Sequence, residues 1–362
     1  MRFLPDAEQK EFGRTLDRML TASGTPPAVR AWARGAYGPG LALWQRVADA
    51  GVFALAAPEA YGGAGLLPVE LAVAFVELGR HCVPGPLAET VAATVLLARL
   101  GEEEPAREWV PRVCAGRARV TLTLPGGGPY ALDAEAADAV FTVTGSGLLS
   151  LSPGHGPVRS SVDPARRPAR PSGGGTLLAS GPAVRAAAAL AADWAAFATA
   201  AQALGVGLAL LDRTVAHARQ RTQFGAPIGS FQAVKHRLAD TFIGLEFARP
   251  LVHGAAVALA SESPTARAEV AAAKAASCDA AHTAARTALQ VHGAIGYTAE
   301  YDLSLWIGKA RALRSAWGGP AECRARVVEM TPRYFLSKTP ANLLAWQSPH
   351  VSGHCPCAAS CD

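Results

Sequence analysis

The chain has 362 residues, 50% of them hydrophobic, and its 34 Lys+Arg against 29 Asp+Glu give a formal net charge of +5. This composition permits a full buried core, divided into roughly two or three lobes, and argues against intrinsic disorder. The positive charges are spread along the chain, so they favour a small anionic ligand over a nucleic-acid surface, which would need a basic stripe with interleaved aromatic residues.

The N-terminal residues lack the apolar core of a signal peptide. No stretch reaches the ~18 uninterrupted apolar residues of a membrane helix, because Arg and Asp interrupt even the Ala-rich segment 183–210. We therefore expect a soluble, cytoplasmic protein with neither a membrane nor a nucleic acid as partner.

The first 115 residues have the pattern of helices separated by Gly/Pro turns. Segments 6–20 and 41–52 carry apolar residues near helical spacing, and the Gly-rich stretch 57–65 that follows cannot be part of a helix. Segment 68–79 starts with Pro near its first turn and ends beside a Gly, which predicts a helix, and 88–100 predicts another.

The character of the sequence changes after residue 115. Segments 119–124 and 139–144 alternate like strands among Gly, Pro and Ser, which predicts a small β region over 116–185. Long helical patterns return from 182 to about 334, with an apolar stripe that includes Leu204, Leu208 and Leu211. Helices, then strands, then helices indicate an α+β fold with segregated lobes and not an alternating parallel sheet.

Segment 221–240 predicts a helix that ends at Arg221, a Gly/Pro turn, and a second helix that begins near Ser230 and is capped by that hydroxyl. Arg221 at such a turn offers a two-pronged donor to a phosphate, and Gln232 offers an amide to a neighbouring group. From the residues alone, a plain helical hairpin turn with a solvated Arg is the better-supported alternative.

A second segment, 290–302, places Gly293 and Gly296 three residues apart directly after a helical Gln. Glycines let the backbone approach a ligand that a Cβ would push away. Alone, this spacing usually marks the C-terminal cap of a helix.

The two segments resemble signatures of the acyl-CoA dehydrogenase family. Segment 221–232 is similar to R-x-Q-F-G-x-P-I-x-x-F-Q, and 290–300 to Q-V-H-G-G-x-G-F/Y-x-x-E, with Ala in place of the second Gly. The resemblance implies FAD bound mainly by a neighbouring subunit, with its pyrophosphate and adenine side reached by Arg221, Gln223, Phe224 and Gln232. It also implies that the adenosine diphosphate is covered by Gln290, Val291, His292, Gly293 and Ala294.

Segment 44–65 and its continuation over 77–89 resemble the N-terminal pattern of the same family. The implied fold has a helical N-terminal domain over 1–115, a shortened β-sheet middle domain over 116–185 and a C-terminal four-helix bundle over 186–337. Residues 338–362 would form a flexible tail.

The resemblance fails at the catalytic base. The family keeps a Glu either in the loop after the last long helix or on the long helix that leads to the R-x-Q-F-G turn, and these positions fall on Gly318 and Ala195. The α-proton of an acyl thioester must leave as the flavin accepts the β-hydride, so a base is required.

Three nearby carboxylates are weak substitutes for this base. Glu322 suits the first turn of a helix after Pro320, and Asp193 lies on a different helix face from Ala195. We expect Glu300 to cap or pair within its turn.

The middle region also departs from the family, because neither a T-E-P-x-x-G-S-D-like loop nor a W-I-T-like strand for the flavin ring is found. The run 161–167 resembles the shortened middle domain of small bacterial subunits that pair with a larger, catalytically complete dehydrogenase in α2β2 assemblies.

The expected function is FAD-associated α,β-desaturation of an acyl thioester, bound to CoA or to a carrier, as an enzyme or as its non-catalytic subunit. Expected partners are a second copy or a larger homologous subunit, with an electron-transfer flavoprotein also possible. The alternative is a repurposed, flavin-free fold that binds an acyl intermediate or performs a non-redox step.

Of the seven cysteines, four lie singly in apolar or helical sequence, and we interpret them as reduced core thiols: Cys82, Cys114, Cys278 and Cys323. The others cluster with two histidines near the C-terminus: His350, His354, Cys355, Cys357 and Cys361. These residue types suit a metal, but they lie in the expected flexible tail, so we predict no metal site.

Overall fold

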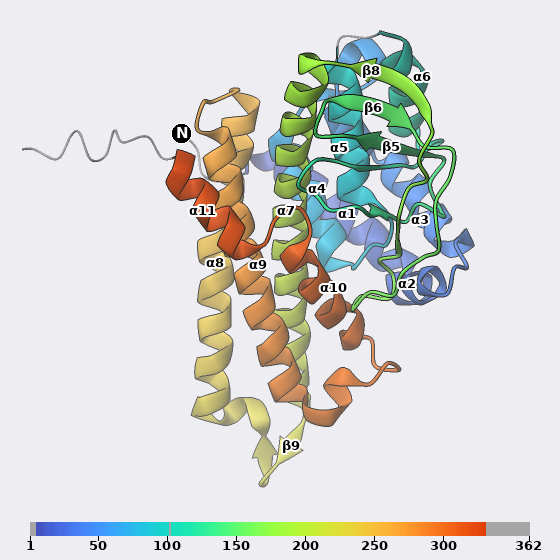
Figure 1. Cartoon of the computed structure of the whole chain (residues 1–362). Helices are drawn as coiled ribbons and strands as arrows, with labels where there is room; N and C mark the ends of the chain where they lie inside the picture. Colours follow the sequence, from blue (N-terminus) through green and yellow to red (C-terminus); the bar gives the residue numbers. More distant parts are fainter. Residues whose placement is uncertain (1–4, 101–102, 331–362) are drawn as a thin grey trace, which may run out of the picture.

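The computed structural model describes residues 5–100 and 103–330, and within them the chain forms three successive groups of elements (Figure 1). A helical group is followed by a β group and by a second helical group, so the expected α+β class is confirmed. The first group contains α1 (Ala7–Ser23), α2 (Thr25–Ala33), α3 (Gly38–Asp49), η1 (Val52–Leu55), β1 (Ala56–Ala57), η2 (Glu59–Tyr61), β2 (Gly65–Leu66), α4 (Pro68–Arg80), α5 (Leu87–Arg99) and α6 (Glu103–Cys114).

Local sequence signals fix the boundaries of the first helices. The side chain of Asp6 accepts a hydrogen bond from the backbone N–H of Gln9, and the side chain of Gln9 accepts one from the backbone N–H of Asp6. This capping box starts α1. Gly24 ends α1 in the left-handed conformation, and two prolines in the first turn of α2 start the next helix at once. The core beneath these helices contains Trp44, which stacks on Phe53 with ring centroids 4.3 Å apart.

The β group is small and stands beside the helices. Its strands are β3 (Val120–Thr123), β4 (Ala131–Leu132), β5 (Ala139–Val143), β6 (Leu148–Leu151), β7 (Pro168–Ala169) and β8 (Thr176–Ser180). A four-stranded sheet has the order β3-β5-β6-β8, in which β3 and β5 are parallel and the other pairs antiparallel, and β4 pairs with β7 separately.

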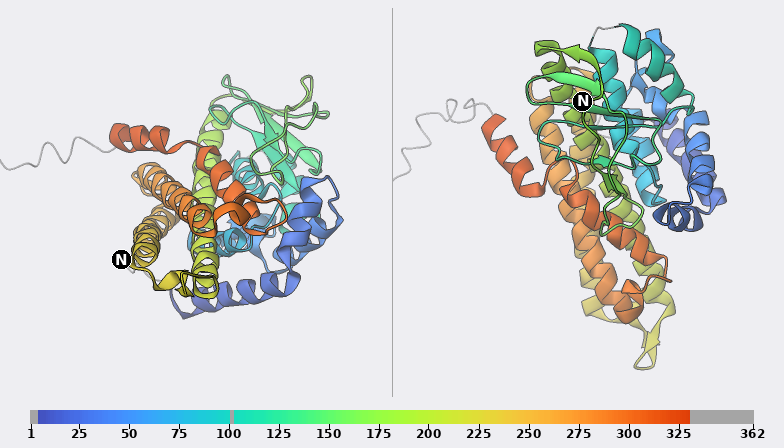
Figure 2. Two further views of the ribbon diagram at one scale, coloured as in Figure 1. Left: turned by 90° about the horizontal axis from the view of Figure 1, so that it is seen from below. Right: turned by 45° about the vertical axis from the view of Figure 1, so that its right-hand side comes forward.

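The second helical group is a bundle whose lower end projects beyond the rest of the molecule (Figures 1 and 2). It contains α7 (Pro182–Gln220), β9 (Thr222–Gln223), β10 (Ala226–Pro227), η3 (Ile228–Ser230), α8 (Gln232–Ala260), α9 (Ala266–His292), η4 (Gly293–Tyr297), α10 (Leu303–Ser315) and α11 (Pro320–Met330). Helices α7, α8, α9 and α10 pack together, in agreement with the expected four-helix bundle.

Helix α7 is also the wall against which the N-terminal helices pack. A Cβ on Gly79 would lie 2.1 Å from the carbonyl oxygen of Gln202, and one on Gly205 would lie 1.9 Å from that of Val76. Only glycines allow α4 and α7 to approach so closely. This contact joins the first and last groups into one core.

Two helices, α7 and α8, are long and apolar enough to cross a membrane by length and composition alone. The apolar window of α7 is 100% buried inside the protein, so its hydropathy serves the core, whereas only 44% of the corresponding window of α8 is buried. The rest of α8 leaves an apolar face uncovered in the single chain.

Charged side chains fix the run 161–167 to both helical groups. Lys309 Nζ lies 3.2 Å from Asp163 Oδ2, and both side chains are almost fully buried. Arg166 pairs with Glu89 at 3.5 Å. Arg167 donates to Tyr37, to the carbonyl oxygen of Ala33 and to Glu135. The shortened middle segment therefore has a defined position against α2, α5 and α10.

The four cysteines expected as core thiols are buried and free, as predicted. The Cys/His cluster of residues 350–361 and the expected tail lie outside the described residues.

Candidate functional site

The first predicted ligand segment forms the tip of the bundle. Helix α7 ends at Gln220, and β9 and β10 form a short hairpin whose turn residues Phe224 and Gly225 have φ values of 52° and 78°. The expected hydroxyl cap on α8 is wrong. The hydroxyl of Ser230 donates to the carbonyl oxygen of Pro227 at 2.7 Å, because a 3₁₀ turn precedes the helix, and α8 starts at Gln232 without a side-chain cap.

The proposed ligand residues at this tip point outward. Arg221, Gln223 and Gln232 are exposed, and the ring of Phe224 is 95% exposed. The guanidinium of Arg221 makes no hydrogen bond or ion pair with the part of the chain that the structure describes. Its five donors are therefore available to an anion from outside this chain.

The second predicted segment lies at the same end of the bundle, where α9 ends (Figure 1). Gln290, Gly293 and Ala294 are exposed and Val291 is half-buried. His292 is buried, and its ring stacks on His217 of α7 with centroids 4.0 Å apart. The stack brings the two sequence segments together into one surface.

The stacked histidines favour their neutral forms. The Nδ1 atom of His292 lies 2.8 Å from the carbonyl oxygen of Ala288, which suits a ring N–H donor. Burial lowers the pKa of His292. Burial, and then the neighbouring charges of His292 and Arg221, lower the pKa of His217.

This end of the bundle presents exposed polar groups that suit an anionic ligand. The guanidinium of Arg221 can donate two parallel hydrogen bonds to a diphosphate. The side-chain amides of Gln223, Gln232 and Gln290 add donors and acceptors. Gly293 has a φ of 64° and no Cβ, so a ligand can approach its backbone closely.

The two positions expected for the family's base carry no carboxylate. Ala195 is fully buried in α7. Gly318 has a φ of 106°, and a Cβ there would lie 3.2 Å from Cys323 Sγ.

The substitutes behave largely as the sequence suggests. Glu322 is in the first turn of α11, accepts from the backbone N–H of Gly319 at 3.4 Å and pairs with Arg326 at 3.6 Å. Asp193 pairs with Arg267 at 3.3 Å, and burial raises the pKa of Asp193 to about 6.

Glu300 differs from the expectation. Only its backbone carbonyl oxygen accepts a hydrogen bond, from Arg30, and among the described residues its side chain neither caps nor pairs. Asp302 forms the ion pair with Arg30 instead.

Two cavities that sequence reasoning missed flank Trp317, the residue before Gly318. One, of about 230 Å³, is lined by Gly318, Glu322 and three arginines: Arg185, Arg267 and Arg326. The other, of about 420 Å³, lies between β3 and the end of α10 and contains the buried Glu89. Gly318 and Glu322 were considered as base positions, but no local pattern singles out Glu89 or the three arginines, since these come from segments far apart in the sequence.

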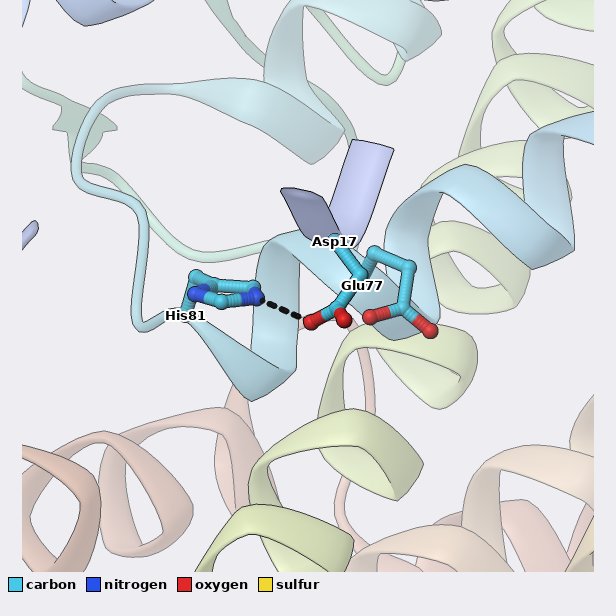
Figure 3. A group of neighbouring side chains, drawn as sticks. All are labelled: Asp17, Glu77 and His81. Carbon is cyan, nitrogen blue, oxygen red and sulfur yellow. Dashed lines mark hydrogen bonds and ion pairs between the residues drawn. The ribbon is translucent and has the colours of Figure 1, made fainter. Parts of the chain in front are cut away.

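Asp17, Glu77 and His81 form a separate cluster between α1 and α4 (Figure 3). His81 Nε2 lies 2.8 Å from Asp17 Oδ1, and burial raises the pKa of Glu77 to about 7. The residue types suit a metal ion. Arg80 Nε lies 3.6 Å from Glu77 Oε2 and already supplies a positive charge there, so we interpret the cluster as an ion-pair network that joins the two helices.

Comparison with known proteins agrees with the sequence resemblance. Two domain models match the chain, "Acyl-CoA dehydrogenase, N-terminal domain" over residues 6–117 and "Acyl-CoA dehydrogenase, C-terminal domain" over residues 185–331. Acyl-CoA dehydrogenase IpdE2 from Mycobacterium tuberculosis is 33% identical over 325 residues, which cover 89% of this chain and 97% of the relative.

Solved structures give the same result. A variant of the Tcur3481-Tcur3483 steroid ACAD aligns with a TM-score of 0.79 and 26% identity over 91% of this chain and 99% of that one. The ChsE4-ChsE5 complex from Mycobacterium tuberculosis aligns with a TM-score of 0.76 and 26% identity over 94% of this chain and 100% of that one.

Proposed function

Since the chain belongs to the acyl-CoA dehydrogenase family, whose members are oxidoreductases that act on CH–CH bonds, we propose that it serves as an FAD-associated subunit in the α,β-desaturation of an acyl thioester. In this proposal the chain does not supply the base at either family position. It completes the flavin site of a partner subunit, which supplies that base.

One observation carries the proposal: the hairpin of β9 and β10 that follows α7, and the end of α9, lie at the projecting end of the bundle (Figure 1), whereas Gly318, between α10 and α11, lines a cavity with Gly126 and Gly127 of the β group. At this end of the bundle Arg221 is exposed and makes no side-chain hydrogen bond or ion pair within the described residues, whereas Gly296 and Tyr297 line a cavity of about 580 Å³. In this proposal the ligand held by Arg221 is shared with another subunit.

FAD, when bound, supplies the acceptor for the β-hydride. The residues of this chain would hold the other end of the cofactor. Arg221 would bind the diphosphate through its fork, the amides of Gln232 and Gln290 would orient the adenosine part, and the ring of Phe224 would exclude water from the contact.

The outer face of α8 supports association with a homologous subunit. Four large apolar side chains lie exposed along it: Phe242 at 51%, Ile243 at 49%, Phe247 at 73% and Leu251 at 42%. An apolar patch of this kind marks a protein contact. Tetramers are typical of the family, and the partner in this proposal is a larger dehydrogenase chain that retains its Glu, by analogy with the ChsE4-ChsE5 complex.

The same proposal includes three further points. The chain divides into domains at residues 115/116 and 185/186, a division supported by the limits of the two matched regions. An electron-transfer flavoprotein reoxidises the cofactor. The assembly works in the cytoplasm.

The test is to purify the chain alone and after co-expression with a homologous, Glu-containing dehydrogenase chain. We expect a colourless or weakly yellow protein alone, and a stable complex with a flavin absorbance band and acyl-CoA dehydrogenase activity after co-expression. Full activity of the chain alone would contradict the subunit role. A colourless, inactive complex would favour the flavin-free alternative.

A further inference from the structure

One side of the bundle gathers basic side chains from α9, α10 and α11, three helices that pack together. This basic face consists of His282 and Arg286 on α9, Arg311 and Arg314 on α10, and Arg324 on α11, and it includes Asp279 of α9. Its members are spread over 45 residues of the sequence, so no run of charges marks the face before the chain folds.

Helix α9 places its members of the basic face one above another. Asp279, His282 and Arg286 are spaced by three and by four residues, so their side chains leave the helix on the same side. Gln290 follows Arg286 by four residues, is exposed, and belongs to the segment that would bind the shared nucleotide. The basic face therefore continues along α9 to the tip of the bundle.

Helices α10 and α11 widen the face. Arg314 Nη2 lies 3.0 Å from Asp279 Oδ1, and Arg324 pairs with the other oxygen of that carboxylate. Arg311 precedes Arg314 by three residues and thus lies on the same side of α10. Burial lowers the pKa of His282, and the charges of the arginines on α9 and α10 lower it further, so these side chains lie close enough to interact.

The basic face carries more positive charge than its own residues neutralise. Asp279 is shared by two arginines, Arg314 and Arg324. Arg286 and Arg311 are exposed and make no hydrogen bond or ion pair with other residues that the structure describes. Four guanidiniums thus accompany the carboxylate of Asp279, and an acidic surface laid over them would relieve their mutual repulsion.

The place of the basic face in the molecule indicates what covers it. A helix rises about 1.5 Å per residue, so Arg286 lies about 6 Å along α9 from Gln290. A stable protein contact covers roughly 800 Å² of each partner, an area about 28 Å across. A subunit that shares the nucleotide held at Gln290 is therefore expected to cover Arg286 as well.

A second copy of this chain is a poor partner for the basic face. In a symmetric dimer the same patch lies on both sides of the contact, so guanidiniums would face guanidiniums, and opposed like charges disfavour association. An acidic surface supplies carboxylates, each of which can accept two parallel hydrogen bonds from Arg286 or Arg311. Arginine is also enriched at protein–protein contacts, where such paired hydrogen bonds form.

We propose that the basic face binds an acidic face of the larger dehydrogenase subunit, and that its charge selects this partner over a second copy of the chain. The inference rests on the proposed function for the existence of that subunit. Arg286 and Arg311, whose guanidiniums are left without a carboxylate in the single chain, contribute most of the selection. The matching surface of the partner carries Asp or Glu side chains next to the shared nucleotide.

The test measures the dissociation constant of the co-expressed complex by analytical ultracentrifugation, at about 50 mM and about 500 mM NaCl. We expect the complex of the unaltered chain to weaken about 10-fold or more at the higher salt concentration, because salt screens exposed charges. Arg286→Glu combined with Arg311→Glu should weaken the complex about 10-fold or more at low salt, and should remove most of the salt dependence.

Two further variants separate the role of these charges from a general effect. Arg286→Lys combined with Arg311→Lys keeps the charge and should retain most of the affinity. Arg117→Glu combined with Arg170→Glu makes the same change in net charge at exposed positions after α6 and after β7, and should leave the affinity unchanged. The altered side chains are exposed, so the melting temperatures of all three double variants should match that of the unaltered chain.

An unchanged dissociation constant and salt dependence in Arg286→Glu with Arg311→Glu would overturn the inference and leave the proposed function in place. Self-association of the unaltered chain that this double variant abolishes would also overturn it, because the face would then bind a second copy. Loss of ADP affinity with the subunit complex intact would assign the face to the nucleotide instead. Absence of any complex with a Glu-containing dehydrogenase chain would contradict the proposed function, and the inference with it.

Discussion

Lys274, fully buried in α9, donates a hydrogen bond to the carbonyl oxygen of Gly318 at 3.0 Å. It also reaches the carbonyl oxygen of Leu313 at 3.1 Å and lies 3.2 Å from Cys278 Sγ. The ammonium group therefore satisfies a carbonyl oxygen at the end of α10 and another in the loop at the family's base position, and connects both to α9.

Removal of this ammonium should destabilise the protein. Lys274→Met leaves two buried carbonyl oxygens without their donor, so we expect a loss of about 2–4 kcal/mol in the free energy of unfolding. Urea denaturation followed by circular dichroism measures it. Lys235→Met, at an exposed position of α8, is the matched control and should change stability by less than about 0.5 kcal/mol.

Restoring a glutamate at the family position should not restore catalysis in the isolated chain. Gly318→Glu forces a side chain onto a backbone with a φ of 106° and a Cβ to within 3.2 Å of Cys323 Sγ, so we expect destabilisation of about 1–2 kcal/mol and no gain in acyl-CoA oxidation. At Gly319 an added Cβ meets no atom within 4 Å, and Gly319→Glu should be tolerated. Dehydrogenase activity in Gly318→Glu would refute this prediction.

Arg221 should contribute to nucleotide affinity without contributing to stability. Arg221→Ala should weaken ADP binding about 10-fold, and Arg221→Lys should recover only part of it, because an ammonium cannot form the two-pronged contact. Both variants should keep the melting temperature, since the side chain is exposed. The exposed neighbour Arg219 provides the control: if Arg219→Ala weakened ADP equally, the effect would be one of general charge.

The His217–His292 stack should make the tip sensitive to acid. The pKa values of both imidazoles are lowered in the folded chain from their usual 6.5. The unfolded chain therefore binds more protons than the folded chain below that pH. The contribution of the two histidines to the free energy of unfolding is complete above about pH 6.5 and is lost as the pH falls through their lowered pKa values in the folded chain.

Melting temperatures recorded across this range would test the sign. His292→Gln should flatten the acid side of the profile, whereas the exposed His236→Gln should not. If the melting temperature of His292→Gln fell with decreasing pH as it does in the unaltered chain, other groups would be responsible for the acid sensitivity.

A charge on the outer face of α8 should disrupt the assembly. Phe247 is 73% exposed in the single chain, and Phe247→Glu would place a charge within an apolar contact, so we expect a smaller oligomer by light scattering and loss of the co-purifying partner. Val328 is equally exposed, at 76%, but belongs to α11 and not to α8. Val328→Glu should leave the assembly unchanged.

Most helices and strands could be predicted from local sequence signals. The pattern over 68–79 predicted α4, and the helix spans Pro68–Arg80, because its start and end depend on a proline and on the side chains of one turn. The strands predicted near 119 and 139 also exist, because β-branched and apolar residues favour strands there, but they are buried on nearly all positions and not on one face alone. Ser230 failed as a cap because the intervening 3₁₀ turn is set by the hairpin before it.

Among the candidate site residues, too, those within a local motif were predicted and those brought together by the fold were not. Arg221 and Gln290 were found because each belongs to a contiguous motif. Glu89 was missed as a site residue, since its contact with Trp317 joins positions 228 residues apart. Burial of a carboxylate beside a cavity becomes visible only after the three lobes have been assembled.

Helix α7 has 39 residues, which correspond to a rod of about 58 Å. Arg185 and Ala188 near its start line the arginine-rich cavity, and Arg221 follows its end. A rotation of one degree about the start of such a rod displaces the far end by about 1 Å, on the scale of a hydrogen bond. In the proposed assembly, occupancy of the cavity at one end of α7 is thus geometrically linked to nucleotide binding at the other end, and mutations that kink α7 should uncouple the two.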